Sequence, residues 1–281
     1  MRTVIDVIID IVERNAYSLN SSLLLRGANV VQANGVPFED YIMNLFSDNL
    51  FEPNKRAYRR KIDETFSCLH ATNYSPDYLI KSGDAIEVKK TERYANEYQF
   101  NSSYPKNKLF PDSPKLHPGA MKAETWSEKD MLYVFGVVPE GKRIALMSFI
   151  YGSEFAADRR FYEDIEKKIS DAVSSYESVD TNELGRLNGI DPLHLTSLRI
   201  RGMWLVKNPL KQIDGILDLE MSNSFSFVCL MDPKKYETDP HKSNLEELSR
   251  DRHNLKIQDI EISHPDTLIL KKSKLITYFV R

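Results

Sequence analysis

The stretch of residues 75–90, SPDYLIKSGDAIEVKK, constrains the fold of this chain more than any other. Apolar residues alternate with polar ones on both sides of KSG at residues 81–83, which is typical of two strands joined by a tight turn. Three-residue hairpin loops need one residue in the left-handed backbone region, and we expect Gly83 to supply it. The pattern therefore predicts an antiparallel β-hairpin.

The charged residues of this hairpin fall on one face. With the turn placed in this way, Asp77 faces Glu87 across the two strands. Side chains alternate along a strand, so Asp77, Glu87 and Lys89 share one face. Ile86 and Val88 lie on the opposite face, which we expect to be buried in the core. Opposed residues have Cβ atoms about 5 Å apart, so the two carboxylates are close enough to share one cation.

This arrangement predicts metal-dependent hydrolysis of a phosphodiester. Two carboxylates and a backbone carbonyl are oxygen ligands of the kind that Mg²⁺ binds. Lys89 is placed to orient or deprotonate a water molecule and to stabilise negative charge on a phosphate. The alternative is a solvated hairpin whose charges pair with one another. Pro-Asp also occurs at residues 111–112 and 265–266, but no Glu-x-Lys in a paired strand follows there, which favours a site at the first copy.

The composition places the chain among soluble globular proteins. Its 281 residues are 41% hydrophobic and 28% charged, and no apolar run approaches the roughly 18 residues of a membrane span. Cys68 and Cys229 show neither disulfide nor metal-ligand spacing, which favours a reduced, cytoplasmic setting. A net charge of −3 argues against a protein that coats nucleic acid by charge alone, although a local basic cleft is compatible with it.

The order of predicted elements indicates a mixed α/β fold. Helices are expected at the N-terminus and over residues 34–51 and 158–176, and buried strands over residues 130–138 and 144–152. On the helix at residues 158–176, the apolar positions that share one side are Phe161, Ile165, Ile169, Ala172 and Val173. No Gly-, Pro- or Ser-rich break divides the chain. We therefore expect one domain over residues 1–281, with a catalytic core at about 34–180 and a C-terminal elaboration at about 181–281, to which the resemblance described next assigns DNA recognition.

Pro76-Asp77 followed by Glu87-Val88-Lys89 resembles the PD-(D/E)xK motif of the restriction-endonuclease-like nucleases. The segments FEDYIMNLF, NSSYPKNKL and ELGRLNGIDPL resemble type II restriction endonucleases that cut GGCC-like palindromes, and the likeness covers roughly residues 34–206. It implies an αβββαβ core with a C-terminal α+β elaboration, and Mg²⁺-dependent cleavage by a homodimer on palindromic double-stranded DNA. It also implies a restriction–modification system, whose cognate DNA methyltransferase acts on the same site.

Carried over by position, the resemblance implies that Asp77 and Glu87 are metal ligands and that Lys89 is a water-orienting base or charge stabiliser. Many such enzymes also place a glutamate of the first core helix beside the site, and Glu39 matches that place. The alternative for Glu39 is an ordinary acid in the first turn of a helix, where the helix dipole favours it.

Four residues near the end of the likeness are candidates for reading DNA. Arginine recognises guanine through two hydrogen bonds to its major-groove edge. Arg186 and Asn188 flank a turn and are expected to project from a loop, and Arg199 and Arg201 share one face of a predicted strand. The alternative is that each arginine pairs with an acid at the surface.

The segment NSSYPKNK at residues 101–108 follows the catalytic strand directly. Its Ser103, Tyr104 and Lys106 are candidates for phosphate contacts, which set the position of a protein on DNA without reading the bases. A structure- or damage-directed DNA nuclease with the same core is an alternative function. A second alternative is a non-catalytic DNA-binding module or a structural protein with an ion-paired hairpin, and the complete acid–acid–lysine set argues against it.

Overall fold

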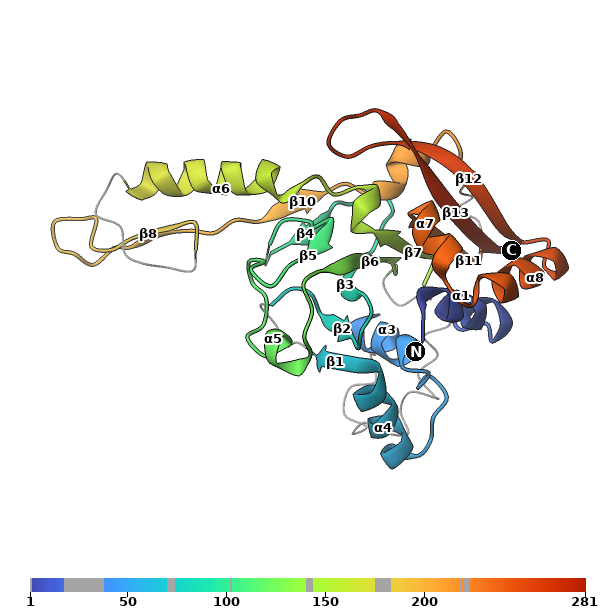
Figure 1. Cartoon of the computed structure of the whole chain (residues 1–281). Helices are drawn as coiled ribbons and strands as arrows, with labels where there is room; N and C mark the ends of the chain where they lie inside the picture. The colour runs from blue at the N-terminus through green and yellow to red at the C-terminus, as the bar shows by residue number, and fades with distance from the viewer. Residues whose placement is uncertain are drawn as a thin grey trace.

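A mixed β-sheet forms the centre of the molecule (Figure 1). The computed structural model describes residues 2–17, 38–69, 74–101, 103–139, 144–174, 183–217, 219 and 223–281. Its main strands, in spatial order, are β1 (Phe66–Leu69), β2 (Tyr78–Ile80), β3 (Ala85–Thr91), β6 (Lys129–Val137), β7 (Leu146–Tyr151), β11 (Phe225–Met231), β13 (Leu270–Val280) and β12 (Leu255–Ser263). The pairs β3–β6 and β7–β11 are parallel, and the other neighbouring pairs in this order are antiparallel.

Shorter strands extend this framework. Strand β5 (Lys108–Leu109) pairs antiparallel with the beginning of β6. Two small antiparallel sheets join β4 (Tyr98–Phe100) to β10 (Trp204–Val206) and β8 (Gly185–Leu187) to β9 (Leu198–Ile200). The pairing of β4 with β10 ties the segment after the catalytic strand to the last third of the chain.

Helices cover both sides of the sheet and extend beyond it. They are α1 (Val4–Glu13), α3 (Phe38–Phe46), α4 (Lys55–Thr65), α5 (Ala120–Ala123), α6 (Arg159–Ser174), α7 (Pro233–Thr238) and α8 (Lys242–Asp251), with 3₁₀ turns η1 (Gly152–Glu154) and η2 (Pro209–Ile213). Apolar residues at helical spacing explain the packing of α1, whose Thr3 and Asp6 form a capping box at its start. Mixed α/β architecture confirms the predicted fold class. None of the described helices is both long and apolar enough to cross a membrane.

Two hydrophobic cores lie against the sheet, one on each face. The first joins side chains of α1, α3, α7 and α8 to one set of alternating sheet residues, among them Ile86 and Val88. The second joins β4, α5 and η2 to the other set, among them Leu79, Ala85 and Tyr133. Both faces of the sheet are therefore covered, as strands in α/β proteins commonly are.

Helix α6 forms within the range that the sequence predicts to be helical. It extends away from the sheet together with the β8 hairpin (Figure 1). Of the apolar side predicted for it, Val173 is buried, but Phe161, Ile165 and Ile169 are exposed. The apolar side expected from the sequence is therefore mostly exposed in the structure.

Candidate active site

The hairpin forms with the predicted register. Tyr78 lies opposite Ile86 and Leu79 opposite Ala85. The backbone N–H of Asp77 donates to the carbonyl of Ile86 at 2.9 Å, which continues the ladder beyond the last regular pair. Asp77 directly precedes β2 and Glu87 is the third residue of β3, so this pairing brings the two acids near each other.

The turn uses a different residue from the one predicted. Ser82 has the positive φ of 52°, whereas Gly83 is not in the left-handed region. Gly83 is needed for space, because a Cβ atom there would lie 2.9 Å from the side chain of Ile80. The backbone N–H of Ser82 donates to the carboxylate of Glu124 at 2.8 Å, which holds the turn in place.

Glu87 is the buried centre of the site. Its side chain is about 5% exposed and forms an ion pair with the amine of Lys89, two residues along the same face of β3. Its other carboxylate oxygen accepts a hydrogen bond from the hydroxyl of Ser75 at 3.0 Å. Asp77 accepts a hydrogen bond from the backbone N–H of Val88 at 2.7 Å. The acids and the lysine that the sequence singled out thus lie together, held by Ser75 and the backbone of β3.

The electrostatics of this cluster reflect crowding of like charges. Partial burial and the neighbouring Glu87 raise the pKa of Asp77 well above its usual value, and Lys89 opposes this rise. Burial lowers the pKa of Lys89, but the charges of Glu87 and Asp77 outweigh burial and raise it overall. The site therefore carries more negative charge than its one lysine neutralises.

Aromatic residues form the wall behind the cluster. Glu87 is paired with Tyr133 on the parallel strand β6, and the hydroxyl of Tyr133 accepts a hydrogen bond from the backbone N–H of Lys106 at 2.6 Å. The amine of Lys89 lies 5.3 Å from the ring centre of Phe100. These contacts bring the segment after β4 against the catalytic strand.

Glu39 lies in the first turn of α3, a helix that packs against β3. Its side chain is exposed, and its charge acts on both Asp77 and Lys89. The structure thus brings Glu39 toward the cluster, as the resemblance implied, without a direct contact to the other acids among the described hydrogen bonds.

The proposed phosphate-contacting residues lie inside the protein. Ser103, Tyr104 and Lys106 are all buried. The amine of Lys106 donates to the hydroxyl of Ser103, and burial lowers the pKa of Lys106 to about 8, partly offset by Glu87. The hydroxyl of Tyr104 donates to Glu163 of α6 at 2.8 Å. This arrangement disfavours direct phosphate contacts for all three residues.

The proposed base-reading residues are separate from the cluster, on the hairpin beside α6. Arg199 and Arg201 both pair with Glu183, at 2.5 and 2.7 Å. The guanidinium of Arg186 donates to the side chain of Asn188 at 2.9 Å. The sequence analysis gave pairing with an acid as the alternative for each arginine. Arg199 and Arg201 have such a partner, and Arg186 does not among the described ion pairs.

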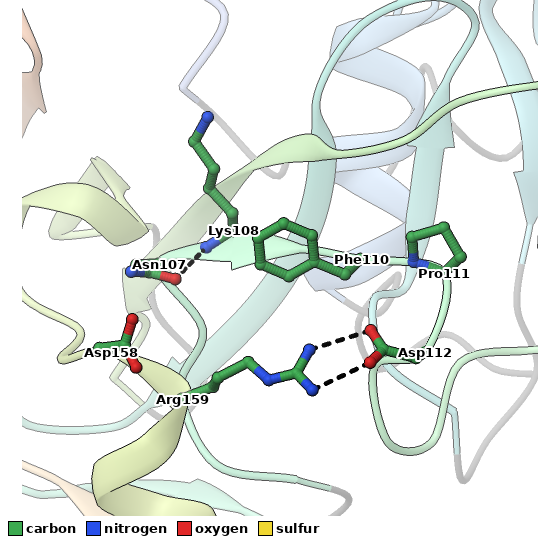
Figure 2. A pocket seen from close by; sticks show the side chains of 7 residues that line it. All are labelled: Asn107, Lys108, Phe110, Pro111, Asp112, Asp158 and Arg159. Carbon is green, nitrogen blue, oxygen red and sulfur yellow. Dashed lines mark hydrogen bonds and ion pairs between the residues drawn. The ribbon is translucent and has the colours of Figure 1, made fainter.

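A pocket of about 430 Å³ lies near the base of α6 (Figure 2). Two parallel hydrogen bonds of 2.9 Å join Arg159, the first residue of α6, to Asp112 across it. Its lining does not include Asp77, Glu87 or Lys89; the lining residues are Asn107, Lys108, Phe110, Pro111, Asp112, Asp158 and Arg159. The pocket is therefore separate from the acidic cluster, and its ion pair fixes the start of α6.

Comparison with known proteins identifies the family. The family model of the NgoPII restriction endonuclease matches residues 2–263. The chain belongs to this family. It is 34% identical to the type II restriction enzyme NgoPII of Neisseria gonorrhoeae, over 98% of this chain and 99% of that protein. No solved structure matches the chain significantly. The NgoPII family places the chain among the site-specific deoxyribonucleases of restriction–modification systems.

Two contributors to the site in this family member escaped the sequence analysis. Ser75 directly precedes the Pro-Asp pair, so its position next to the motif was the available signal. Tyr133 lies in a strand that reads as uniformly apolar, and only the parallel pairing of β3 with β6 places it beside Glu87. Lys106 was singled out, but its burial depends on contacts that no local pattern encodes.

Proposed function

We propose that this protein is a Mg²⁺-dependent endonuclease that hydrolyses both strands of double-stranded DNA at a short, GC-rich palindrome such as GGCC. The observation that carries the proposal is the cluster at the β2–β3 hairpin, in which Asp77 is bonded to the backbone of Val88 in β3 and the amine of Lys89 pairs with Glu87. Membership of the NgoPII family supports DNA as the substrate.

The acidic pair fits a small, hard cation. Both side chains of the pair offer carboxylate oxygens. Among the described residues, no group of three or more His, Cys, Asp and Glu side chains is arranged to hold a metal, so an ion bound here would take two protein carboxylates and complete its shell with water. Mg²⁺ suits such a site because it typically takes one or two carboxylates and keeps several waters. The ion, when bound, acidifies water and offsets charge on the phosphate.

The side chains around the ion have separate tasks. Asp77 and Glu87 hold it, and Ser75 fixes the direction of the Glu87 carboxylate through its hydrogen bond of 3.0 Å. Lys89 brings a positive charge to the same face, where it can orient water and stabilise negative charge on the phosphate. Glu39 stands at the exposed side, where its charge reaches both Asp77 and Lys89 and adds to the attraction for the cation.

Recognition and assembly follow from the symmetry of a palindrome. Two copies of the chain related by a two-fold axis present one catalytic cluster to each DNA strand. The exposed hairpin that carries Arg186, Asn188, Arg199 and Arg201 is the element we assign to base recognition. For Arg199 and Arg201, binding guanine means leaving Glu183. A cognate methyltransferase protects the same DNA site without having to bind this protein.

Digestion of a plasmid of known sequence tests the proposal. The expected result is a set of discrete fragments with Mg²⁺, none with a chelator, and fragment ends that share one palindrome. Asp77→Asn should abolish the fragments, and Lys81→Ala, in the turn, should leave them unchanged. A smear of fragments would indicate a structure-directed or non-specific nuclease. Binding without cleavage under all these conditions would indicate a non-catalytic module.

A further inference from the structure

Helix α6 carries an exposed apolar stripe. Phe161, Ile165 and Ile169 are 54%, 47% and 38% exposed, although they recur every four residues as core residues of a helix do. Each step of four residues advances about 6 Å along the helix. The stripe is therefore a continuous apolar ridge about 12 Å long with Ile165 at its centre.

The neighbouring flank of α6, about 100° around the helix axis from the stripe, already holds the helix to the body. The ring of Tyr162 stacks on Tyr104 with the ring centres 4.9 Å apart, and Glu166 accepts a hydrogen bond from Trp204 at 3.2 Å. Together with the ion pair of Arg159 at its start, these contacts fix the rotation of α6. The stripe cannot turn inward without breaking them.

The exposed apolar side chains of this protein gather on the part that projects from the sheet. Of the 17 large hydrophobic side chains that are exposed among the described residues, nine lie between residues 161 and 205. Scattered apolar residues at a surface are normal, but a concentration of them marks an interaction surface. Three of the nine form the stripe on α6, and the other six lie at residues 190–205, which include the hairpin assigned above to DNA; the stripe is therefore the part of this surface that still lacks a partner.

The charge of α6 argues for protein and against DNA as that partner. Surfaces that bind DNA are strongly positive. On α6 the basic and acidic residues balance: they are Arg159, Arg160, Lys167 and Lys168 against Glu163, Asp164, Glu166 and Asp171. Lys167 and Lys168 also pair with acids one turn away, at 2.9 and 2.6 Å. The stripe thus lies on an electrically neutral helix.

We propose that α6 packs against α6 of a second copy of this chain, with a two-fold axis passing beside Ile165. A homotypic contact brings like surfaces together, so a neutral helix suits it and a strongly charged one does not. In antiparallel packing, Phe161 of one copy lies beside Ile169 of the other, and Ile165 meets its own copy. The choice of a second copy as the partner of this stripe rests on the proposed function, in which two catalytic clusters act on one symmetric DNA site.

The contact also reaches toward the active site. Tyr104 bonds to Glu163 of α6 and lies two residues before Lys106, whose backbone is bound to Tyr133 behind Glu87. Pairing of the two α6 helices therefore fixes, in each copy, the element that supports the segment behind the catalytic strand.

Disulfide trapping tests the axis directly, without DNA. Cβ atoms must come within about 4.5 Å for a disulfide to form, and residues on a two-fold axis meet this condition. With diamide as oxidant, Ile165→Cys should yield a covalent dimer. Lys167→Cys, on the far side of the same helix, and the wild-type chain with its native Cys68 and Cys229 should remain monomeric on a non-reducing gel. Equal yields from both positions would overturn the proposal.

A charge placed on the axis gives the second test. Ile165→Asp puts two like charges side by side in the dimer, so we expect its dissociation constant to rise by roughly 100-fold or more. Sedimentation should then give the mass of one 32.5 kDa chain, whereas Lys167→Asp should stay dimeric. A monomeric wild type, or an unaffected Ile165→Asp dimer, would overturn the proposal. So would an Ile165→Asp variant that remains dimeric but no longer binds DNA. Failure of Asp77→Asn to alter cleavage would contradict the proposed function instead.

Discussion

Two antiparallel hairpins in this chain carry charged residues at alternating positions, and their surroundings differ. The β2–β3 hairpin lies within the sheet, where cores on both faces enclose Leu79, Ala85 and Ile86. The β8–β9 hairpin projects with α6, and Leu198 and Arg199 of β9 are exposed. In the first hairpin a carboxylate is buried among other charges. In the second, arginines at the surface pair with a nearby acid.

The comparison shows that alternation of charge gives a chemical site only where neighbouring elements exclude water. A buried ion pair is costly to break because the remaining charge has lost its hydration, whereas an exposed pair contributes little. The cluster around Glu87 should therefore respond strongly to substitution in both stability and catalysis. The pair of Glu183 with Arg199 should respond weakly in stability, so its residues are free to exchange partners.

The largest effect is expected from removing the lysine of the buried cluster. Lys89→Ala should lower the cleavage rate at saturating Mg²⁺ by roughly 10²–10³-fold, because one positioned donor and positive charge is lost. It should also lower the free energy of unfolding by a few kcal/mol, since Glu87 stays buried without its partner. Single-turnover cleavage and urea unfolding measure the two effects.

Lys90→Ala is the matched control for this substitution. Lys90 is the next residue of β3, is exposed, and faces away from the cluster. Its loss should change neither the cleavage rate nor the unfolding curve. If Lys90→Ala and Lys89→Ala behave alike, the difference drawn between the two faces of β3 is wrong.

Burial of Lys106 should appear in the pH dependence of stability. Its pKa is about 8 in the folded protein and 10.5 in the unfolded chain, so between these values the unfolded state binds more protons. Stability from this group therefore rises from pH 8 to pH 10.5, and its cost is fully present below pH 8. Lys106→Met should be more stable than wild type by up to about 3 kcal/mol at pH 7.

That advantage should shrink toward zero as the pH approaches 10.5. Taking the difference between the two proteins at each pH removes the contribution of the tyrosines, which titrate in both. Lys90→Met, at an exposed position, should show no pH-dependent difference. A difference between Lys106→Met and wild type that stays constant from pH 7 to pH 10.5 would show that Lys106 is not buried as a lysine with a lowered pKa.

Local patterns predicted the hairpin well because its register depends on residues close in sequence. The turn length and the alternation together predicted the register in which Tyr78 lies opposite Ile86 and Leu79 opposite Ala85, as in the structure. The residue with positive φ was assigned wrongly to Gly83, because the sequence cannot separate a glycine needed for its backbone from one needed for space beside Ile80. The register is unaffected by that error.

Contacts between distant segments were beyond the sequence. The spacing of the apolar residues of α6 predicted that they share one side of a helix, but it does not say whether that side packs in the core or forms an intermolecular contact. The buried state of Lys106 depends on its bond to Tyr133, 27 residues away. Periodicity identifies which residues share a face of an element, and it does not say what covers that face.

Ser75 should have a smaller effect than Lys89, confined to the metal. Ser75→Ala removes the hydrogen bond that directs one oxygen of Glu87, so the Mg²⁺ concentration for half-maximal cleavage should rise by about 10-fold or more. The maximal rate at high Mg²⁺ should change much less, and Ser75→Thr, which keeps the hydroxyl, should restore the wild-type response. Ser148→Ala, at another buried serine of the sheet, should not change the Mg²⁺ requirement. A fall in maximal rate with an unchanged Mg²⁺ requirement would assign Ser75 a purely structural role.

Substitutions in the exposed β8–β9 hairpin should have the smallest effect on stability, and they should change the affinity for DNA independently of stability. Arg199→Ala breaks an ion pair at the surface, so the melting temperature should not change measurably. If the arginine leaves Glu183 to bind guanine, affinity for the cleavable palindrome should fall about tenfold, while affinity for unrelated DNA changes less. Glu183→Gln should have the opposite sign, because it releases both arginines from their shared partner. Titration of labelled duplexes at fixed salt, without metal, measures both variants. Equal losses on cleavable and unrelated DNA would make Arg199 a phosphate contact, and no loss on either would leave its pairing with Glu183 as its only role.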